Sequence, residues 1–258
     1  MAQFACNYIS KILGRAVTVN VIVPSPAYGE ASASYCPEVS FPVLYLIPGD
    51  GGDENSWMRY TSIERYAEEN RIAVVMCPVE NTAGLDQTVF IPFGKTQPYT
   101  DPDSRFIDIR NICFSRFITE ELVEFVSGYF PVSNCADDMY LAGQGEGAFT
   151  SLLLAAQTGK YAAVGSFGYC AVDSTSLWYA YAKMDISDQH YPSVVFLADR
   201  FEENTVELRK MLTEFEMCVQ KQHIPAHSEW GMCDKAVKSF IEQLPRKDCY
   251  AKLEKRRL

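Results

Sequence analysis

The chain has 258 residues, of which 48% are hydrophobic and 22% charged, and its formal net charge is −10. This length and composition are those of one large globular domain with a sizeable core, which excludes extensive disorder. The acidic balance argues against nucleic acid and against an anionic membrane surface as partners.

The nine cysteines are scattered, and no CxxC pair occurs, which excludes a zinc ribbon and a thioredoxin-like motif. Cys77 and Cys218 stand in apolar stretches, where a reduced cysteine acts as a small hydrophobic residue. The N-terminal residues do not resemble a secretory leader, and no apolar run approaches the ~18 residues that span a bilayer. We therefore expect a cytoplasmic protein with reduced thiols.

Strand signals come first along the chain. Residues 16–24 alternate apolar and polar side chains, as a half-buried strand does. Residues 42–47 and 72–77 are short apolar runs, typical of parallel strands covered on both faces. Between these runs, the amphipathic spacing of residues 56–70 predicts a helix.

Strand and helix signals alternate in the rest of the chain. Residues 115–129 are predicted to form a helix with Ser115 as its N-cap. The remaining predicted strands are 138–142, 162–167, 193–198 and 219–224, and the remaining predicted helices are 146–157, 202–218 and 233–243. This alternation predicts an α/β fold: one domain over residues 1–258, with a mostly parallel twisted sheet and helices on both faces. Ligands of such sheets bind at the carboxyl ends of the strands.

Two stretches do not follow this alternation. Residues 81–111 are rich in Pro, Gly, Thr and Asp, and residues 172–190 contain Trp178 and several tyrosines. Long loops in compact domains usually serve function or cover a site. We predict that both loops cover the mouth of the binding site.

The sharpest local motif is Gly143-Gln-Gly145-Glu-Gly147, which follows a predicted strand and begins a predicted helix. A Gly-x-Ser-x-Gly nucleophile elbow occupies this context in α/β-hydrolases, and its glycines permit a sharp turn. Here the central residue is Gly145. A dinucleotide-binding fingerprint would require G-x-G-x-x-G, which this motif lacks. The motif alone leaves open a plain strand-to-helix turn without a ligand.

Further landmarks stand in a fixed order around this motif. They are Leu13-Gly14-Arg15, PVLYLIPGDGG at 42–52, Asn55-Ser-Trp57, Ile118-Thr-Glu-Glu-Leu122, Tyr129-Phe-Pro131 and His227-Ser-Glu-Trp230. With these landmarks the chain resembles the esterase D-like family of putative esterases, most closely the small bacterial tributyrin esterases. The resemblance extends from about residue 10 to Pro245. It implies an α/β-hydrolase fold, carboxylesterase chemistry by a Ser–Asp–His triad, and neither a cofactor nor a metal.

The resemblance assigns each member of the triad to a position. The serine falls on Gly145, the acid on Arg200 and the histidine on Ser228. Asp199 and His227 each stand one residue early, so a one-residue shift would restore an acid and a base. No shift restores the nucleophile, because glycine has no side chain and the serine hydroxyl is the attacking group.

The region of the family's oxyanion hole is altered as well. The loop contains Gly49, Asp50 and Gly51, and the residue after the nucleophile position is Glu146. Backbone N–H donors are compatible with these residues, but the carboxylates of Asp50 and Glu146 disfavour a developing negative charge. A different interpretation makes Asp50, Asp53 and Glu146 a Ca²⁺ or Mg²⁺ site, although such sites require six or more oxygen ligands.

The sequence therefore predicts an esterase-family protein impaired in catalysis, a pseudoenzyme that binds a small ester or related molecule. The alternative is an active carboxylesterase for short-chain acyl esters with a relocated nucleophile, either Ser228 or Cys170. Self-association into a homo-oligomer is a further expectation from the family resemblance.

Overall fold

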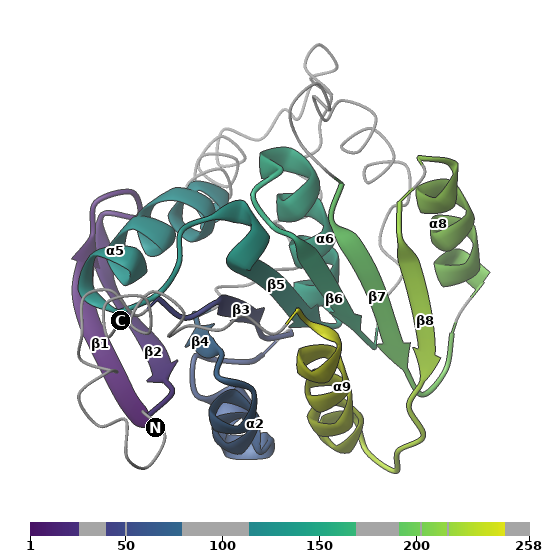
Figure 1. Ribbon diagram of the computed structural model, residues 1–258, viewed down its shortest axis with the longest axis horizontal. Helices are drawn as coiled ribbons and strands as arrows, with labels where there is room; N and C mark the ends of the chain where they lie inside the picture. The colour runs from purple at the N-terminus through teal and green to yellow at the C-terminus, as the bar shows by residue number, and fades with distance from the viewer. Residues whose placement is uncertain are drawn as a thin grey trace, which may run out of the picture.

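The computed structural model describes residues 1–25, 40–49, 51–78, 114–168, 191–201, 203–215 and 217–245. Within these ranges eight strands form one sheet in the order β1-β2-β4-β3-β5-β6-β7-β8 (Figure 1). Strand β2 is antiparallel to its neighbours β1 and β4, and every other neighbouring pair is parallel. The mostly parallel sheet predicted from the sequence is confirmed.

The strands agree closely with the predicted runs, with one exception. Their bounds are β1 Ala2–Ser10, β2 Arg15–Val23, β3 Val43–Ile47, β4 Ala73–Met76, β5 Met139–Gln144, β6 Ala163–Phe167, β7 Ser193–Ala198 and β8 Val219–His223. Every residue of β3 and β4 is buried, as their continuous apolar sequences predicted. Strand β1 was missed: it lies at the edge of the sheet and is largely exposed, and only the short alternation of Phe4, Cys6 and Tyr8 indicates it in the sequence.

The helices are α1 Ser56–Tyr60, α2 Ile63–Asn70, the π-helical turn η2 Phe117–Glu121, α5 Leu122–Tyr129, the 3-10 turn η3 Ala136–Asp138, α6 Glu146–Thr158, α8 Glu203–Glu214 and α9 Glu229–Gln243. The single helix predicted over 56–70 is two helices, because Thr61 adopts an extended conformation (φ −133°) between them. Ser115 lies inside helical residues 114–116 and does not cap them. None of the helices in these ranges is both long and apolar enough to cross a membrane.

Helices cover both faces of the sheet, as predicted. Side chains of η2, α5, α6 and α8 form one buried cluster with the sheet, and side chains of α1, α2 and α9 form another. Large aromatic residues fill each cluster, among them Phe117 and Phe149 on the first face and Trp57 and Phe240 on the second. Full burial of such a side chain stabilises the fold by roughly 1.5–3 kcal/mol.

The two cysteines from apolar stretches differ in environment. Cys77 is buried in the first cluster, where burial raises the pKa of its thiol to about 12. Cys218, just before the edge strand β8, is exposed. The interpretation as a buried hydrophobic residue is correct for Cys77 and wrong for Cys218, because β8 is covered on fewer sides than β4.

The Glu121 carboxylate attaches the turn of the edge hairpin β1–β2 to the helical layer. Glu121 accepts hydrogen bonds from the Ser10 hydroxyl (2.7 Å) and from the backbone N–H groups of Lys11 (2.8 Å) and Ile12 (3.0 Å). Burial alone would raise the pKa of Glu121, but these hydrogen bonds outweigh it and lower the pKa below its ordinary value. The ionised carboxylate thus stabilises the fold.

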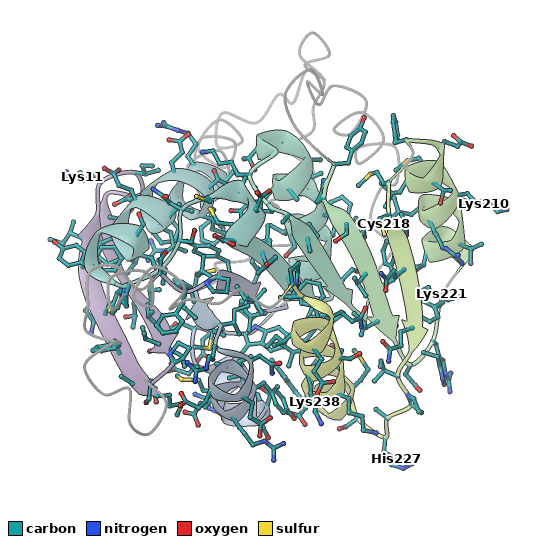
Figure 2. The ribbon with its side chains drawn as sticks, viewed as in Figure 1. Lys11, Lys210, Cys218, Lys221, His227 and Lys238 are labelled. Atoms are coloured by element: carbon teal, nitrogen blue, oxygen red, sulfur yellow. The ribbon has the colours of Figure 1, made fainter. Side chains whose placement is uncertain are left out.

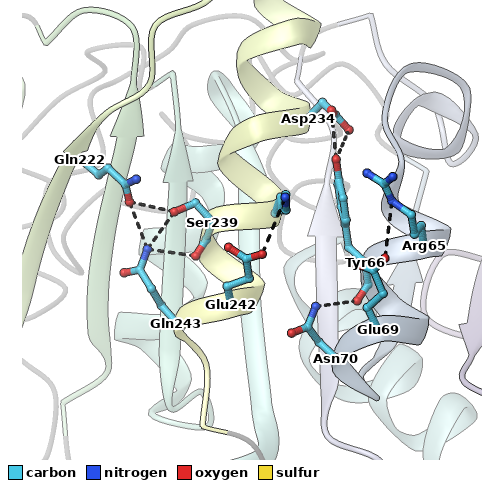
Figure 3. A network of polar contacts seen from close by, with 10 residues as sticks. Arg65, Tyr66, Glu69, Asn70, Gln222, Asp234, Ser239, Glu242 and Gln243 are labelled. Atoms are coloured by element: carbon cyan, nitrogen blue, oxygen red, sulfur yellow. Dashed lines mark hydrogen bonds and ion pairs between the residues drawn. The ribbon is translucent and has the colours of Figure 1, made fainter.

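Polar contacts also join α2 to α9, as Figure 3 shows. The Asp234 carboxylate accepts the backbone N–H of Ser62 (2.7 Å) and the hydroxyl of Tyr66 (3.1 Å). Ser62 precedes α2, so Asp234 satisfies one of the backbone donors that a helix leaves unpaired at its start. This contact therefore fixes the start of α2 against α9.

We predict that Glu121→Gln lowers the free energy of unfolding by roughly 1–2 kcal/mol at neutral pH, because the partly exposed carboxylate accepts three hydrogen bonds. A lowered folded-state pKa gives stability that is present above the unfolded-state pKa and is lost as pH falls through the folded-state pKa. The difference between wild type and variant should therefore shrink in acid, measured by urea denaturation across pH. Glu124→Gln, an exposed change on α5, is the control; an equal effect of both changes would contradict the prediction.

We predict that Asp234→Ala costs roughly 1–2 kcal/mol of unfolding free energy, because a backbone donor and the Tyr66 hydroxyl both lose their acceptor. Tyr66→Phe should cost less, and the double variant should show non-additivity, since the two residues share one hydrogen bond. Glu242→Ala on the same helix, where the carboxylate meets only exposed Lys238 at 3.9 Å, serves as the control. If the losses of unfolding free energy of the two single variants add up to that of the double variant, Asp234 and Tyr66 are not coupled.

Candidate functional site

The motif Gly143 to Gly147 forms a sharp strand-to-helix turn at the carboxyl end of β5. Strand β5 ends at Gln144, helix α6 begins at Glu146, and Gly145 between them has φ 54° and ψ −118°. The N–H of Gly145 donates to the carbonyl of Phe167 (3.0 Å) on β6. This confirms the predicted position of the turn, and the positive φ explains why glycine is well tolerated at its centre.

The three glycines of the turn have different roles. A Cβ at Gly143 would stand 2.2 Å from the carbonyl oxygen of Gly147, and a Cβ at Gly147 would stand 2.4 Å from that of Pro48. A Cβ at Gly145 would meet no atom within 4 Å. The flanking glycines therefore permit close backbone packing, whereas the central position borders open space.

That space belongs to a pocket of about 480 Å³. The pocket lies where the carboxyl ends of β3 and β5 meet the starts of α1, α6 and α9, which is the edge at which ligands of parallel sheets bind. Its described lining consists of Gly49, Gly51, Gly52, Asp53, Ser56, Arg59, Tyr60, Gln144, Gly145, Glu146, Glu229 and Trp230.

Hydrogen bonds hold the loop from β3 to α1 in place. Buried Asn20 on β2 donates to the carbonyl of Glu54 (3.0 Å) and to the side-chain oxygen of Asn55 (2.9 Å). Asp53 accepts the Ser56 hydroxyl (2.8 Å) and lies 3.6 Å from the guanidinium of Arg59. Burial would raise the pKa of Asp53, but hydrogen bonds from Ser56 and Asn55, together with the Arg59 charge, lower it. The described residues on this side of the pocket are therefore held by hydrogen bonds, and the Asp53 carboxylate is ionised.

Of the three helices that begin at the pocket, two begin with a glutamate: α6 with Glu146 and α9 with Glu229. Helix N-termini carry partial positive charge, which these carboxylates partly compensate. Glu229 also accepts a hydrogen bond of 2.6 Å from the side-chain amide of Gln144, so it connects α9 to the end of β5. Carboxylates of the protein therefore lie at two helix N-termini of the pocket, which would otherwise favour the binding of an anionic ligand.

The positions assigned to the triad acid lie beyond the end of β7. Asp199 accepts the N–H of Ala226 (3.4 Å), and its carboxylate oxygen lies 3.8 Å from the Nε2 atom of His223 at the end of β8. Arg200 is exposed. Neither Asp199 nor Arg200 is among the residues that line the pocket.

The positions assigned to the triad base precede α9. The Ser228 hydroxyl accepts the N–H of Gly231 (3.1 Å) and caps the helix, which is why α9 begins at Glu229 instead of the predicted residue 233. His227 is exposed, and Figure 2 shows it at the lower edge of the molecule, away from the sheet. Neither side chain lines the pocket, although Glu229 and Trp230 directly after them do.

The structure thus brings Gly49, Gly51, Gly145 and Glu146 into one pocket and leaves the acid and base positions outside its lining. Among the described residues, no group of three or more His, Cys, Asp or Glu side chains is arranged to hold a metal ion. Several predicted features lie outside the described residues: Asp50, Cys170 and the covering loops 81–111 and 172–190.

Sequence reasoning did not assign a role to several lining residues. Gln144 stands inside the glycine motif, and Glu229 and Trp230 stand inside the His227-to-Trp230 landmark, so their proximity to motif positions was an available signal. Arg59 and Tyr60 follow the Asn55-to-Trp57 landmark, and their side chains reach the pocket because short helix α1 turns them towards it.

Comparison with known proteins supports the fold and the family. The chain is similar to the S-formylglutathione hydrolase of Staphylococcus aureus (22% identity, TM-score 0.70, covering 94% of this chain and 98% of that one). It is also similar to a ferulic acid esterase of Anaeromyces mucronatus (14% identity, TM-score 0.65, 94% and 90% covered). These structures share the α/β-hydrolase fold.

A curated relative is the acetyl esterase of Caldicellulosiruptor saccharolyticus, 22% identical over 152 residues, which are 59% of this chain. The matched part of the chain spans half of that relative's length, 50%. The sequence profile of the family described as "Putative esterase" matches residues 10–239, most of the chain. The chain therefore belongs to the putative esterase family and has its α/β-hydrolase fold.

Proposed function

We propose that this protein is a catalytically impaired member of its family, which keeps the pocket and binds a small ester or related molecule without efficient acyl transfer. The observation that carries this proposal is Gly145 at the centre of the strand-to-helix turn, bordering the pocket. Acyl transfer by a serine hydrolase requires a hydroxyl at this position, together with a base that takes its proton.

The charges around the turn support the same proposal. The oxyanion of a tetrahedral intermediate would form beside Gly145, close to the first turn of α6. Glu146 and Glu229 line this region, and each carboxylate repels a developing negative charge. The backbone of the turn remains compatible with donating N–H groups, so a small residual rate is consistent with the proposal.

The surroundings of the acid and base positions also support the loss of proton transfer by a triad. Ser228 is occupied as the cap of α9, and Asp199 lies near His223 at the ends of β7 and β8. A relocated nucleophile is the alternative, and the activity measurement below decides between the two. On sequence grounds we also propose a cytoplasmic location, a bacterial source and self-association. We propose neither nucleic acid nor a membrane as a partner.

We predict that Gly145→Ser folds, at a cost of about 1–2 kcal/mol of unfolding free energy. The new Cβ meets open space, and only the positive φ is unfavourable. Gly143→Ser should cost at least about 3 kcal/mol or prevent folding, because its Cβ would overlap the backbone of Gly147. Thermal and urea unfolding of the two purified variants measures the difference. Equal tolerance at both positions would show that the close packing of the turn is wrong.

We predict that the wild-type protein hydrolyses p-nitrophenyl acetate far below an ordinary enzyme rate of ~10 s⁻¹. Gly145→Ser alone should add little, because an unactivated hydroxyl is a poor nucleophile at neutral pH. Combining it with Arg200→Asp and Ser228→His should exceed the single variant by more than additivity, since triad members act as a unit. Replacing Glu146 by Met in that background should raise the rate further, because one carboxylate beside the turn is removed.

The controls are an active family member assayed in parallel and Gly145→Ala, which adds the Cβ without a hydroxyl. A wild-type rate near ~10 s⁻¹ would refute impaired catalysis. Labelling with a fluorophosphonate and peptide mapping would then locate the relocated nucleophile.

A further inference from the structure

The charged groups of the pocket favour a particular class of ligand. Among the described lining residues four are charged: Asp53, Glu146, Glu229 and Arg59. Asp53 and Arg59 face each other at 3.6 Å and largely compensate one another. Glu146 has a further interaction partner in the protein, whereas the Glu229 carboxylate accepts the neutral amide of Gln144, and the described lining contains no second cation. An entering anion would meet this negative charge, whereas a cation would be attracted by it.

Gln144 provides an independent indication. It lines the pocket, its side chain is only 5% exposed, and its Nε2 atom donates to Glu229 (2.6 Å). Its Oε1 atom is buried and accepts no hydrogen bond from any described residue. A buried acceptor without a donor is costly, so a ligand N–H group beside Glu229 would supply what this amide lacks. An acyl ester has no such donor.

An aromatic wall stands next to these acceptors. The Trp230 ring packs edge-on against buried Trp57 (5.4 Å between ring centres) and lies 4.9 Å from the Tyr60 ring. Trp230 and Tyr60 both line the pocket, whereas Trp57 holds Trp230 in place from the core. Ordered aromatic rings offer apolar surface to a ligand body and attract a cation over their faces.

We propose that the pocket binds a small organic cation, with a primary ammonium group at Glu229 and Gln144 and an apolar body against Trp230. The space beside Gly145, which a nucleophile would occupy in an active relative, is available to this ligand. The inference rests on the proposed function in that respect only. Among the molecules that the proposed function allows, it specifies one that carries a primary ammonium group.

Three probes with the same phenyl ring, similar size and different charge test the proposal: benzylammonium, benzyl alcohol and benzoate. Their dissociation constants for the full chain are measured by isothermal titration calorimetry at neutral pH and low salt, with tryptophan fluorescence as a second signal. Benzylammonium should bind at least ~10-fold more tightly than benzoate, with benzyl alcohol between them, because tenfold corresponds to about one well-placed charge interaction.

Glu229→Gln should reduce the preference for benzylammonium over benzoate at least ~10-fold, because it keeps the shape of the side chain and removes the charge. Glu64→Gln is the matched control. Glu64 also lies in the first turn of a helix, α2, but outside the pocket lining, so the preference should not change. Trp230→Leu should weaken all three probes while their order is kept.

Three results would overturn the proposal. They are benzoate binding as tightly as benzylammonium, a preference that Glu229→Gln leaves intact, and no binding of benzylammonium at millimolar concentration. The unfolding temperature of each variant, measured without probe, shows whether the variant is folded. The ester assay is separate: rapid hydrolysis refutes impaired catalysis and leaves the amine titration to be judged by its own outcome.

Discussion

Close backbone packing at Gly143 and Gly147 shapes the site. The Cα of Gly147 faces the carbonyl oxygens of Ile47 and Pro48, and Gly143 faces Gly147, at distances that leave no room for a Cβ. These contacts bring the end of β3, the end of β5 and the start of α6 together. They also require the chain to reverse at Gly145 with a positive φ. The pocket, its glycine loop and its helix N-termini are all consequences of this packing.

Electrostatic organisation follows from the same geometry. Because α6 and α9 both begin at the pocket, their N-termini add positive potential at the same place, which in an active hydrolase stabilises an anion. In this chain the first residue of each of these helices is a glutamate, and one of the two glutamates is bonded to the core through Gln144. Each of these two helix starts therefore has a carboxylate of the protein beside it.

Much of the fold could be predicted from the sequence, because short apolar runs such as Val43–Ile47 are typical of a strand covered on both faces. Strand β1 was not predicted, because most of its residues are exposed and its apolar pattern is weak. The turn at Gly145 was predictable because glycines at 143 and 147 report a steric requirement. The assignments at Arg200 and Ser228 relied on counting residues, and the structure gives Ser228 a local role as a helix cap that spacing alone does not reveal. The contact of Gln144 with Glu229 joins residues 85 positions apart, so no local pattern announces it.

The conformation of Gly145 has a consequence for how such a protein evolves. A serine held at positive φ stores conformational strain that the fold must bear as the cost of reactivity. A glycine at this position carries no such strain, so a family member that changes the serine to glycine gains stability. Later destabilising mutations around the site would then be tolerated without unfolding of the protein. Selection for folding alone would then retain the glycine, so a change from serine to glycine at this position would be difficult to reverse.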